Sequence, residues 1–173
     1  MMAPAGNTAD EASLLREAAG GSTKAFLRLV RAYDPAVLNL AVRVAGAEHA
    51  RQIYRDVFVE LHRELGSIEP GTLRNHIYRL AARVCLKHLQ QVRRSGERPA
   101  RGTEHLDWVL RTVTPLERIV FELRHHERLG LREVSEALDI SVAAAKTAFV
   151  RISGRLHCAL ASASGRQGCT EFS

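Results

Sequence analysis

The sequence predicts an all-α protein built from two small helical domains joined by a short linker. Apolar residues recur at spacings of three and four along most of the chain, which is the pattern of helices with one buried face. Long alternating runs of Val, Ile and Thr, which would indicate strands, are absent from the sequence. The segment SGERPARGTE, residues 95–104, has two Gly and one Pro among charged residues and offers no aliphatic side chain to a core. These observations divide the chain into two helical parts.

The first part is expected to hold several helices separated by glycine or proline. Gly20 and Gly21 end a first helix, and Gly46 ends a later one. We expect an interruption near Pro35, because proline lacks the backbone N–H and its ring clashes with the preceding turn. The expected helices cover residues 10–19, 23–32, a stretch that ends near 45, 47–65 and about 73–94, with a loop at 66–71.

Two of these helices have a clear buried face. In the helix at 47–65 the apolar positions follow the three-four spacing, and they are Ala50, Ile53, Tyr54, Val57, Phe58, Leu61 and Leu65. In the helix at 73–94 one side carries Leu73, Ile77, Leu80, Val84 and Leu89. Both helices are therefore expected to pack in one core.

The second part opens on a strong helix start. Thr114 can cap the helix, Pro115 suits its first position, and Glu117 completes a capping box. This helix is expected to run to about residue 126, and two more follow at 131–138 and 142–160. The predicted division is an N-terminal segment at 1–22, a first domain at 23–94, a linker at 95–106, a second domain at 107–160 and a tail at 161–173 that is small, polar and expected to be disordered.

The segment from residue 131 to 152 has the pattern of a helix-turn-helix. Its first helix turns Val134, Ala137 and Leu138 inward. Asp139 stands where such turns need a left-handed backbone, which Asp tolerates better than most residues. Ile140 then fills the corner between the helices. The alternative, an ordinary helical hairpin, would not require this combination.

The second helix of this motif is expected to face DNA. Ser141 caps it, so its first residues point toward the major groove. The residues expected to reach phosphates or base edges are Ser141, Ala144, Lys146, Thr147 and Arg151.

Positive charge is concentrated in one stretch. The whole chain carries a formal net charge of +6, whereas residues 74–101 hold eight Lys or Arg and one Glu. The rest of the chain is therefore close to neutral. Such a stripe favours an anionic partner such as nucleic acid, although a solvated helix face gives the same pattern.

Other classes of function find little support in the sequence. No apolar run approaches the roughly 20 residues that span a bilayer, and the N-terminus lacks the pattern of a signal peptide, so we expect a cytoplasmic protein without membrane insertion. The three cysteines form no CxxC pair and are expected to be reduced thiols. Cys85 and His88 are too few for a metal site, and no catalytic motif stands out. We therefore expect no enzyme, no metal and no cofactor.

The second part resembles region 4 of the sigma-70 family of transcription initiation factors. The resemblance rests on TPLERIVFELRHHERLGLREVSEALDISVAAAKTAFVRISGRL, with its capped helix, the letters EVSEAL and IS, and a helix with a central Lys. The first part is similar to region 2 of the same family through AFLRLVRAYDPAVLNLAVRVAG, DVFVELHREL and TLRNHIYRLAARVCLKHLQQVRR. The two regions stand in this order with no domain between them, as in the extracytoplasmic-function group. The resemblance covers about residues 24–160.

The resemblance implies a sigma factor that directs core RNA polymerase to promoters and assists DNA opening. Its implied partners are core RNA polymerase, promoter DNA and, as a further candidate, an anti-sigma factor. The implied polymerase contacts are Asp56, Val57, Phe58, Glu60 and Leu61. At the −10 element, Asn75, His76 and Tyr78 would meet an unstacked base, and the phosphate contacts would be Arg74, Arg79, Arg83, Lys87, Arg93 and Arg94. The second domain would read the −35 element.

This chain departs from the family pattern at several positions. An acidic run that usually precedes the docking helix is replaced by Arg51 and Gln52. The other departures are Arg55, His76, Arg83 and Ala148. Two alternatives therefore stay open, a helix-turn-helix regulator that acts without polymerase, and a sigma-like adaptor that binds a protein.

Overall fold

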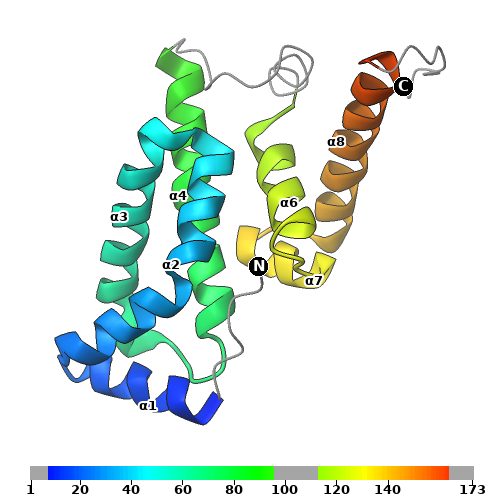
Figure 1. Ribbon diagram of the computed structural model, residues 1–173. Coiled ribbons are helices and arrows are strands. Elements are labelled where there is room, and N and C mark those ends of the chain that lie inside the picture. The colour runs from blue at the N-terminus through cyan, green and yellow to red at the C-terminus, as the bar shows by residue number, and fades with distance from the viewer. Residues whose placement is uncertain (1–7, 96–112, 164–173) are drawn as a thin grey trace.

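The computed structural model describes residues 8–95 and 113–163, and every element in these ranges is a helix (Figure 1). The first helical group comprises α1 (Thr8–Ala19), α2 (Thr23–Ala45), α3 (Ala47–Glu64), the short 3-10 helix η1 (Leu65–Ser67) and α4 (Leu73–Ser95). The second helical group comprises α6 (Pro115–His125), α7 (Leu131–Leu138) and α8 (Val142–Ala163). The expected all-α fold is confirmed. The linker at 95–106 and the tail at 161–173 fall largely outside the described residues.

The interruption expected at Pro35 is wrong, because α2 is one helix from Thr23 to Ala45 with Pro35 inside it. Figure 1 shows that this helix changes direction part-way along its length. Leu29, Tyr33 and Val37 are buried at successive four-residue steps across the proline. Since these side chains anchor both halves of the helix in one core, packing offsets the hydrogen bond that proline removes.

The core of the first group forms where α2, α3 and α4 pack against one another, with α1 across the end of α2. The face of α3 expected from the sequence is inside, since Ile53, Val57 and Leu61 are at most 1% exposed. On α4 the expected residues Leu73, Ile77 and Leu80 are fully buried. The two predicted faces are therefore confirmed.

The second group packs on the first through several helix pairs. Contacts join α4 to α7, α4 to α6 and α2 to α6. The buried residues of both groups form one continuous cluster, which includes Leu80 of α4 and Leu123 of α6. In the described part of the chain the two groups are thus joined by a shared core, and this decides which surfaces remain exposed.

The cysteines differ from expectation in one respect. Cys85 is a buried free thiol, and burial raises its pKa to about 12. Cys158 is disulfide-bonded, so the expectation of three reduced thiols is wrong.

Candidate nucleic-acid interface

The turn between α7 and α8 has the geometry expected of a helix-turn-helix. Asp139 adopts the left-handed conformation, with φ 53° and ψ 48°, and its backbone N–H bonds the carbonyl of Ser135. Ser141 then caps α8, because its hydroxyl accepts the N–H of Ala144 at 3.1 Å. Both predictions are confirmed. The capping box of Thr114 and Glu117 at the start of α6 is also confirmed.

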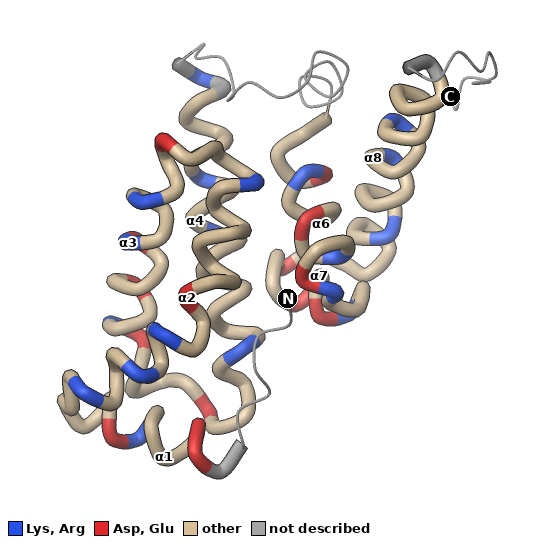
Figure 2. Tube along the Cα trace, in the orientation of Figure 1, with Lys and Arg blue, Asp and Glu red and all other residues tan. Residues whose placement is uncertain are grey.

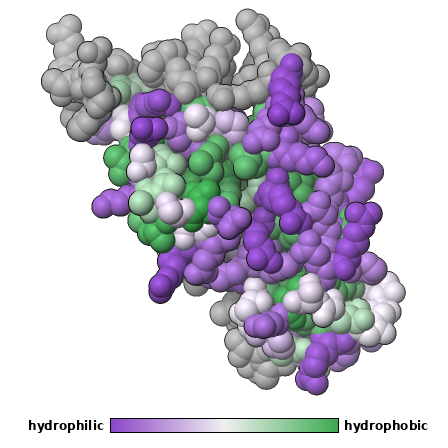
Figure 3. All heavy atoms as spheres, turned by 180° about the vertical axis from the view of Figure 1, so that it is seen from behind, coloured by the Kyte–Doolittle hydropathy of each residue, from purple (hydrophilic) through white to green (hydrophobic). Residues whose placement is uncertain are grey.

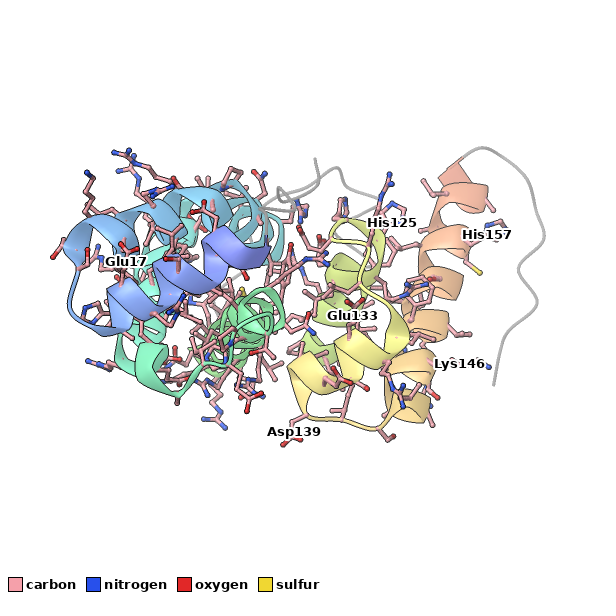
Figure 4. All side chains as sticks on the ribbon, turned by 90° about the horizontal axis from the view of Figure 1, so that it is seen from below. Glu17, His125, Glu133, Asp139, Lys146 and His157 are labelled. Atoms are coloured by element: carbon pink, nitrogen blue, oxygen red, sulfur yellow. The ribbon has the colours of Figure 1, made fainter. Side chains whose placement is uncertain are left out.

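The first turns of α8 present a polar face to solvent. The predicted contact residues Ser141, Ala144, Lys146, Thr147 and Arg151 are all exposed. Figure 4 shows Lys146 pointing away from the second helical group, with Asp139 at the tip of the turn that precedes α8. The opposite face is buried through Ala145, Ala148 and Ile152. Ala148 therefore packs inside, which explains why no basic residue stands at that position.

On α4, the basic residues form an exposed surface only in part. Figure 2 shows basic positions along α4 and acidic positions along α6. Six of the predicted residues are exposed, and these are Arg74, Asn75, Arg79, Arg83, Lys87 and Arg94. The side chain of Arg93 lies outside the described set. His76, Tyr78 and the exposed Arg83 pair with acidic residues outside α4.

His76 is held as a neutral imidazole between two partners. Arg79 lies 2.6 Å from Nδ1, and Nε2 lies 2.7 Å from a carboxylate oxygen of Glu64. Because Nδ1 accepts from a guanidinium, Nε2 carries the proton and donates to Glu64. Burial lowers the pKa of His76, and the charge of Arg79 lowers it further. His76 is thus tied to α3 rather than aimed at solvent.

Arg83 binds acidic residues of α3 instead of projecting freely. Its guanidinium lies 2.7 Å from Glu60 and 3.0 Å from Glu64. Burial alone would raise the pKa of Glu64, but hydrogen bonds from Arg83 and His76 outweigh it, and the net shift is downward. The side chain of Arg83 remains 54% exposed. This ion pair joins a residue predicted to hold phosphate to one predicted to dock polymerase.

Tyr78 is buried, and the second helical group covers it. Its exposed fraction is 1%, and its hydroxyl donates to Glu127 at 2.9 Å. The guanidinium of Arg74 lies 5.6 Å from the ring centroid. Burial and the nearby carboxylate of Glu127 both raise the pKa of Tyr78. In this conformation Tyr78 cannot meet an unstacked base.

Glu127, which accepts the hydrogen bond of Tyr78, belongs to a group of charged residues that the sequence reasoning missed. Arg43 of α2 pairs with Glu122 at 2.7 Å and also with Glu127. Arg118 of α6 donates to the backbone carbonyl of Arg43 at 2.8 Å. These partners are 75 or more positions apart in the sequence, so no local pattern could have joined them.

The predicted polymerase contacts require a correction. Val57 and Leu61 are fully buried and Phe58 is 7% exposed, so these three belong to the core and not to a surface patch. The reason is that they lie on the inner side of α3, which packs against α2 and α4. Of the predicted contacts, only Asp56 and Glu60 reach the surface, where both are half-buried, and Arg51 and Gln52 of the same helix are exposed.

No group of three or more His, Cys, Asp or Glu within residues 8–95 and 113–163 could hold a metal ion. No helix in these ranges is long and apolar enough to cross a membrane. The rear face is largely hydrophilic, with a hydrophobic area in its upper half (Figure 3).

A solved structure shares this two-part helical fold. It is the structure of CnrH in complex with the cytosolic domain of CnrY, with a TM-score of 0.70 and 19% sequence identity. The match covers 88% of this chain and 98% of that chain. CnrH is a sigma factor of the extracytoplasmic-function type. The comparison with family models and the comparison with curated proteins find no match.

Proposed function

We propose that the chain is a sigma factor of the extracytoplasmic-function type, which directs core RNA polymerase to promoters and assists DNA opening. The observation that carries this proposal is the likeness of fold to CnrH over nearly the whole of both chains. A helix-turn-helix alone occurs in many regulators. The α2–α3–α4 bundle before it, with a basic α4, supports the sigma factor over a general regulator.

Each helical group has its own part in this function. The outward face of α8 reads the −35 duplex through Lys146, Thr147 and Arg151, since a recognition helix places its first turns in the major groove. The exposed basic residues of α4 follow the phosphates of the −10 element. On α3, Asp56 and Glu60 contact polymerase. We place the two domains at residues 23–94 and 107–160.

A protein partner is part of the proposal. CnrH was solved in complex with the cytosolic domain of CnrY. By analogy, we propose that an anti-sigma factor binds this chain in the cytoplasm and withholds it from polymerase.

Co-purification with core RNA polymerase from a related bacterium, followed by transcription in vitro on a genomic promoter library, tests the function. We expect a stable complex and transcripts that begin at a shared promoter motif. Specific duplex binding without polymerase would favour the regulator instead. Absence of polymerase binding together with capture of another protein would favour the adaptor.

A variant pair tests the docking surface on α3. Because Arg51 and Gln52 are exposed where the family carries acids, Arg51→Glu with Gln52→Asp should tighten binding to polymerase whose docking site is basic. Arg31→Glu, an exposed change on α2, is the matched control and should leave binding unchanged. Weaker binding of the double variant would mean that the basic residues are themselves contacts.

A further inference from the structure

His76 has an exposed arginine at one ring nitrogen and a carboxylate at the other. Arg79, one turn further along α4, lies 2.6 Å from Nδ1, and a carboxylate oxygen of Glu64 on α3 lies 2.7 Å from Nε2. A guanidinium is always protonated and can only donate, so Nδ1 must be the acceptor of this bond. The contact between Arg79 and His76 therefore exists only while the imidazole is neutral.

Protonation of His76 would force one of these side chains to move. A proton on Nδ1 removes the acceptor and sets two cationic N–H donors against each other at the same short distance. The ring is held in place, because the side chain of His76 is 9% exposed and Nε2 lies beside Glu64, which attracts an imidazolium more strongly than a neutral ring. Arg79 is exposed to solvent. Arg79 is therefore the side chain that leaves.

The other charged groups near His76 favour the same outcome. On α4, Arg83 also lies close to the ring, and it is bound by Glu60 and Glu64 of α3. The short helix η1 adds no charged residue. Burial lowers the pKa of His76, the charges of Arg79 and Arg83 lower it further, and Glu64 opposes them. Departure of Arg79 removes one of the two cations, so the protonated ring and the released arginine favour each other.

We propose that His76 is a proton-operated positioning residue for Arg79, whose guanidinium the neutral ring holds against α4 and the protonated ring releases to a DNA phosphate. This inference rests on the proposed function, because it takes Arg79 as a phosphate contact of α4. A phosphate that binds the released Arg79 prevents its return to His76. The DNA-bound chain therefore takes up more protons than the free chain, and by linkage DNA binding tightens as the pH falls.

Nuclear magnetic resonance measures this linkage at the ring itself. The titration follows the full-length chain, free and with an oligothymidine of about 12 nucleotides, a length within the usual site size for single strands. The signals of His76 are those that His76→Gln removes. We expect the oligothymidine to raise the pKa of His76 in the wild type. Arg79→Ala should raise it in the free chain and abolish most of the further rise that DNA causes.

Fluorescence anisotropy with the same oligothymidine measures the effect on affinity at about pH 7.5 and about pH 5.5. Each unit by which DNA raises the pKa of His76 allows up to about tenfold tighter binding at the lower pH. The log–log slope against salt should steepen by about 0.7 for the added phosphate contact. His76→Gln keeps a neutral acceptor for Arg79 and a donor for Glu64, so its affinity should change less with pH, as should that of Arg79→Ala. His62 is the matched control, an exposed histidine of α3 whose ring lies against Phe26, and His62→Gln should respond to pH as the wild type does.

The outcomes separate this inference from the proposed function. A DNA-dependent rise in the pKa of His76 that needs Arg79, with pH-dependent binding that needs both residues, supports the proposal. Equal rises in the wild type and Arg79→Ala, equal pH responses of the wild type and His76→Gln, or no oligothymidine binding at either pH would overturn it. Arg79 is exposed, so Arg79→Ala tests the proposal even where His76→Gln lowers stability. None of these measurements contains polymerase, so co-purification with core polymerase decides the proposed function separately.

Discussion

Removing the hydroxyl of Tyr78 should lower the free energy of unfolding, and the size of the loss should depend on whether Glu127 is present. The bond is 2.9 Å long, Tyr78 is 1% exposed and the acceptor is a carboxylate that is 9% exposed. A hydrogen bond to a charged group contributes about 1.5–3 kcal/mol. Tyr78→Phe keeps the ring and removes only this bond, so we expect the free energy of unfolding to fall by about that amount.

A double-mutant cycle isolates the interaction. Once Glu127→Ala has removed the acceptor, Tyr78→Phe should cost little more, which gives a coupling energy of about 1.5–3 kcal/mol, within the usual range for neighbouring residues that interact. Ser22→Ala removes the N-cap of α2, whose hydroxyl accepts the N–H of Ala25 at 3.3 Å, and shares no hydrogen bond with Glu127. It should cost about 1 kcal/mol and add independently.

Urea denaturation followed by circular dichroism measures all of these variants. The reasoning would be refuted by Tyr78→Phe and Glu127→Ala adding within about 0.3–0.5 kcal/mol, as distant residues do. The second group would then not rest on Tyr78 in solution.

Three further predictions concern the turn, the recognition helix and the pH response. Asp139→Ala should lower the free energy of unfolding by about 1–2 kcal/mol, because alanine is strained at φ 53°. Asp139→Gly should lower it less, and equal losses of unfolding free energy in urea denaturation would contradict this. The double variant Lys146→Ala with Arg151→Ala should weaken duplex binding, measured by fluorescence anisotropy. The log–log slope of the binding constant against salt concentration should also flatten by about 0.9 for each phosphate that is no longer neutralised. An unchanged slope would exclude a phosphate role for both residues. Since the pKa of His76 is lowered from its ordinary 6.5, the unfolded chain takes up more protons near that pH, and stability should fall as the pH drops through it. His76→Gln should therefore lose less stability than the wild type between about pH 7.5 and about pH 5.5 in urea unfolding, and an equal loss would mean that His76 is not the group responsible. The pKa of Glu64 is also lowered, so both chains should lose further stability below about pH 4.5.

Much of the local structure follows from the sequence alone. The capping box of Thr114 and Glu117, the left-handed Asp139 and the cap at Ser141 all depend on residues within a few positions of one another. The same is true of the buried faces of α3 and α4, because helical spacing decides which residues share a side. Local chemistry was thus sufficient for the helices other than α2, for the turn and for the outward face of α8.

The interruption expected at Pro35 shows the limit of local reasoning. Proline disfavours a helix interior by itself, yet Tyr33 and Val37 are both buried and keep α2 continuous. A tertiary contribution of this kind has no signature in the residues next to the proline.

Only the tertiary structure decided which predicted site residues face solvent. Helical spacing could mark Val57 and Leu61 as apolar, but whether an apolar face meets the core or a partner depends on what packs there, and here α2 and α4 do. Tyr78 is covered because Glu127, 49 positions away, lies over it, and Arg43 meets Glu127 across 84 positions. Contacts at such separations depend on how the two helical groups pack together, and a pattern read along the chain carries no information about that packing.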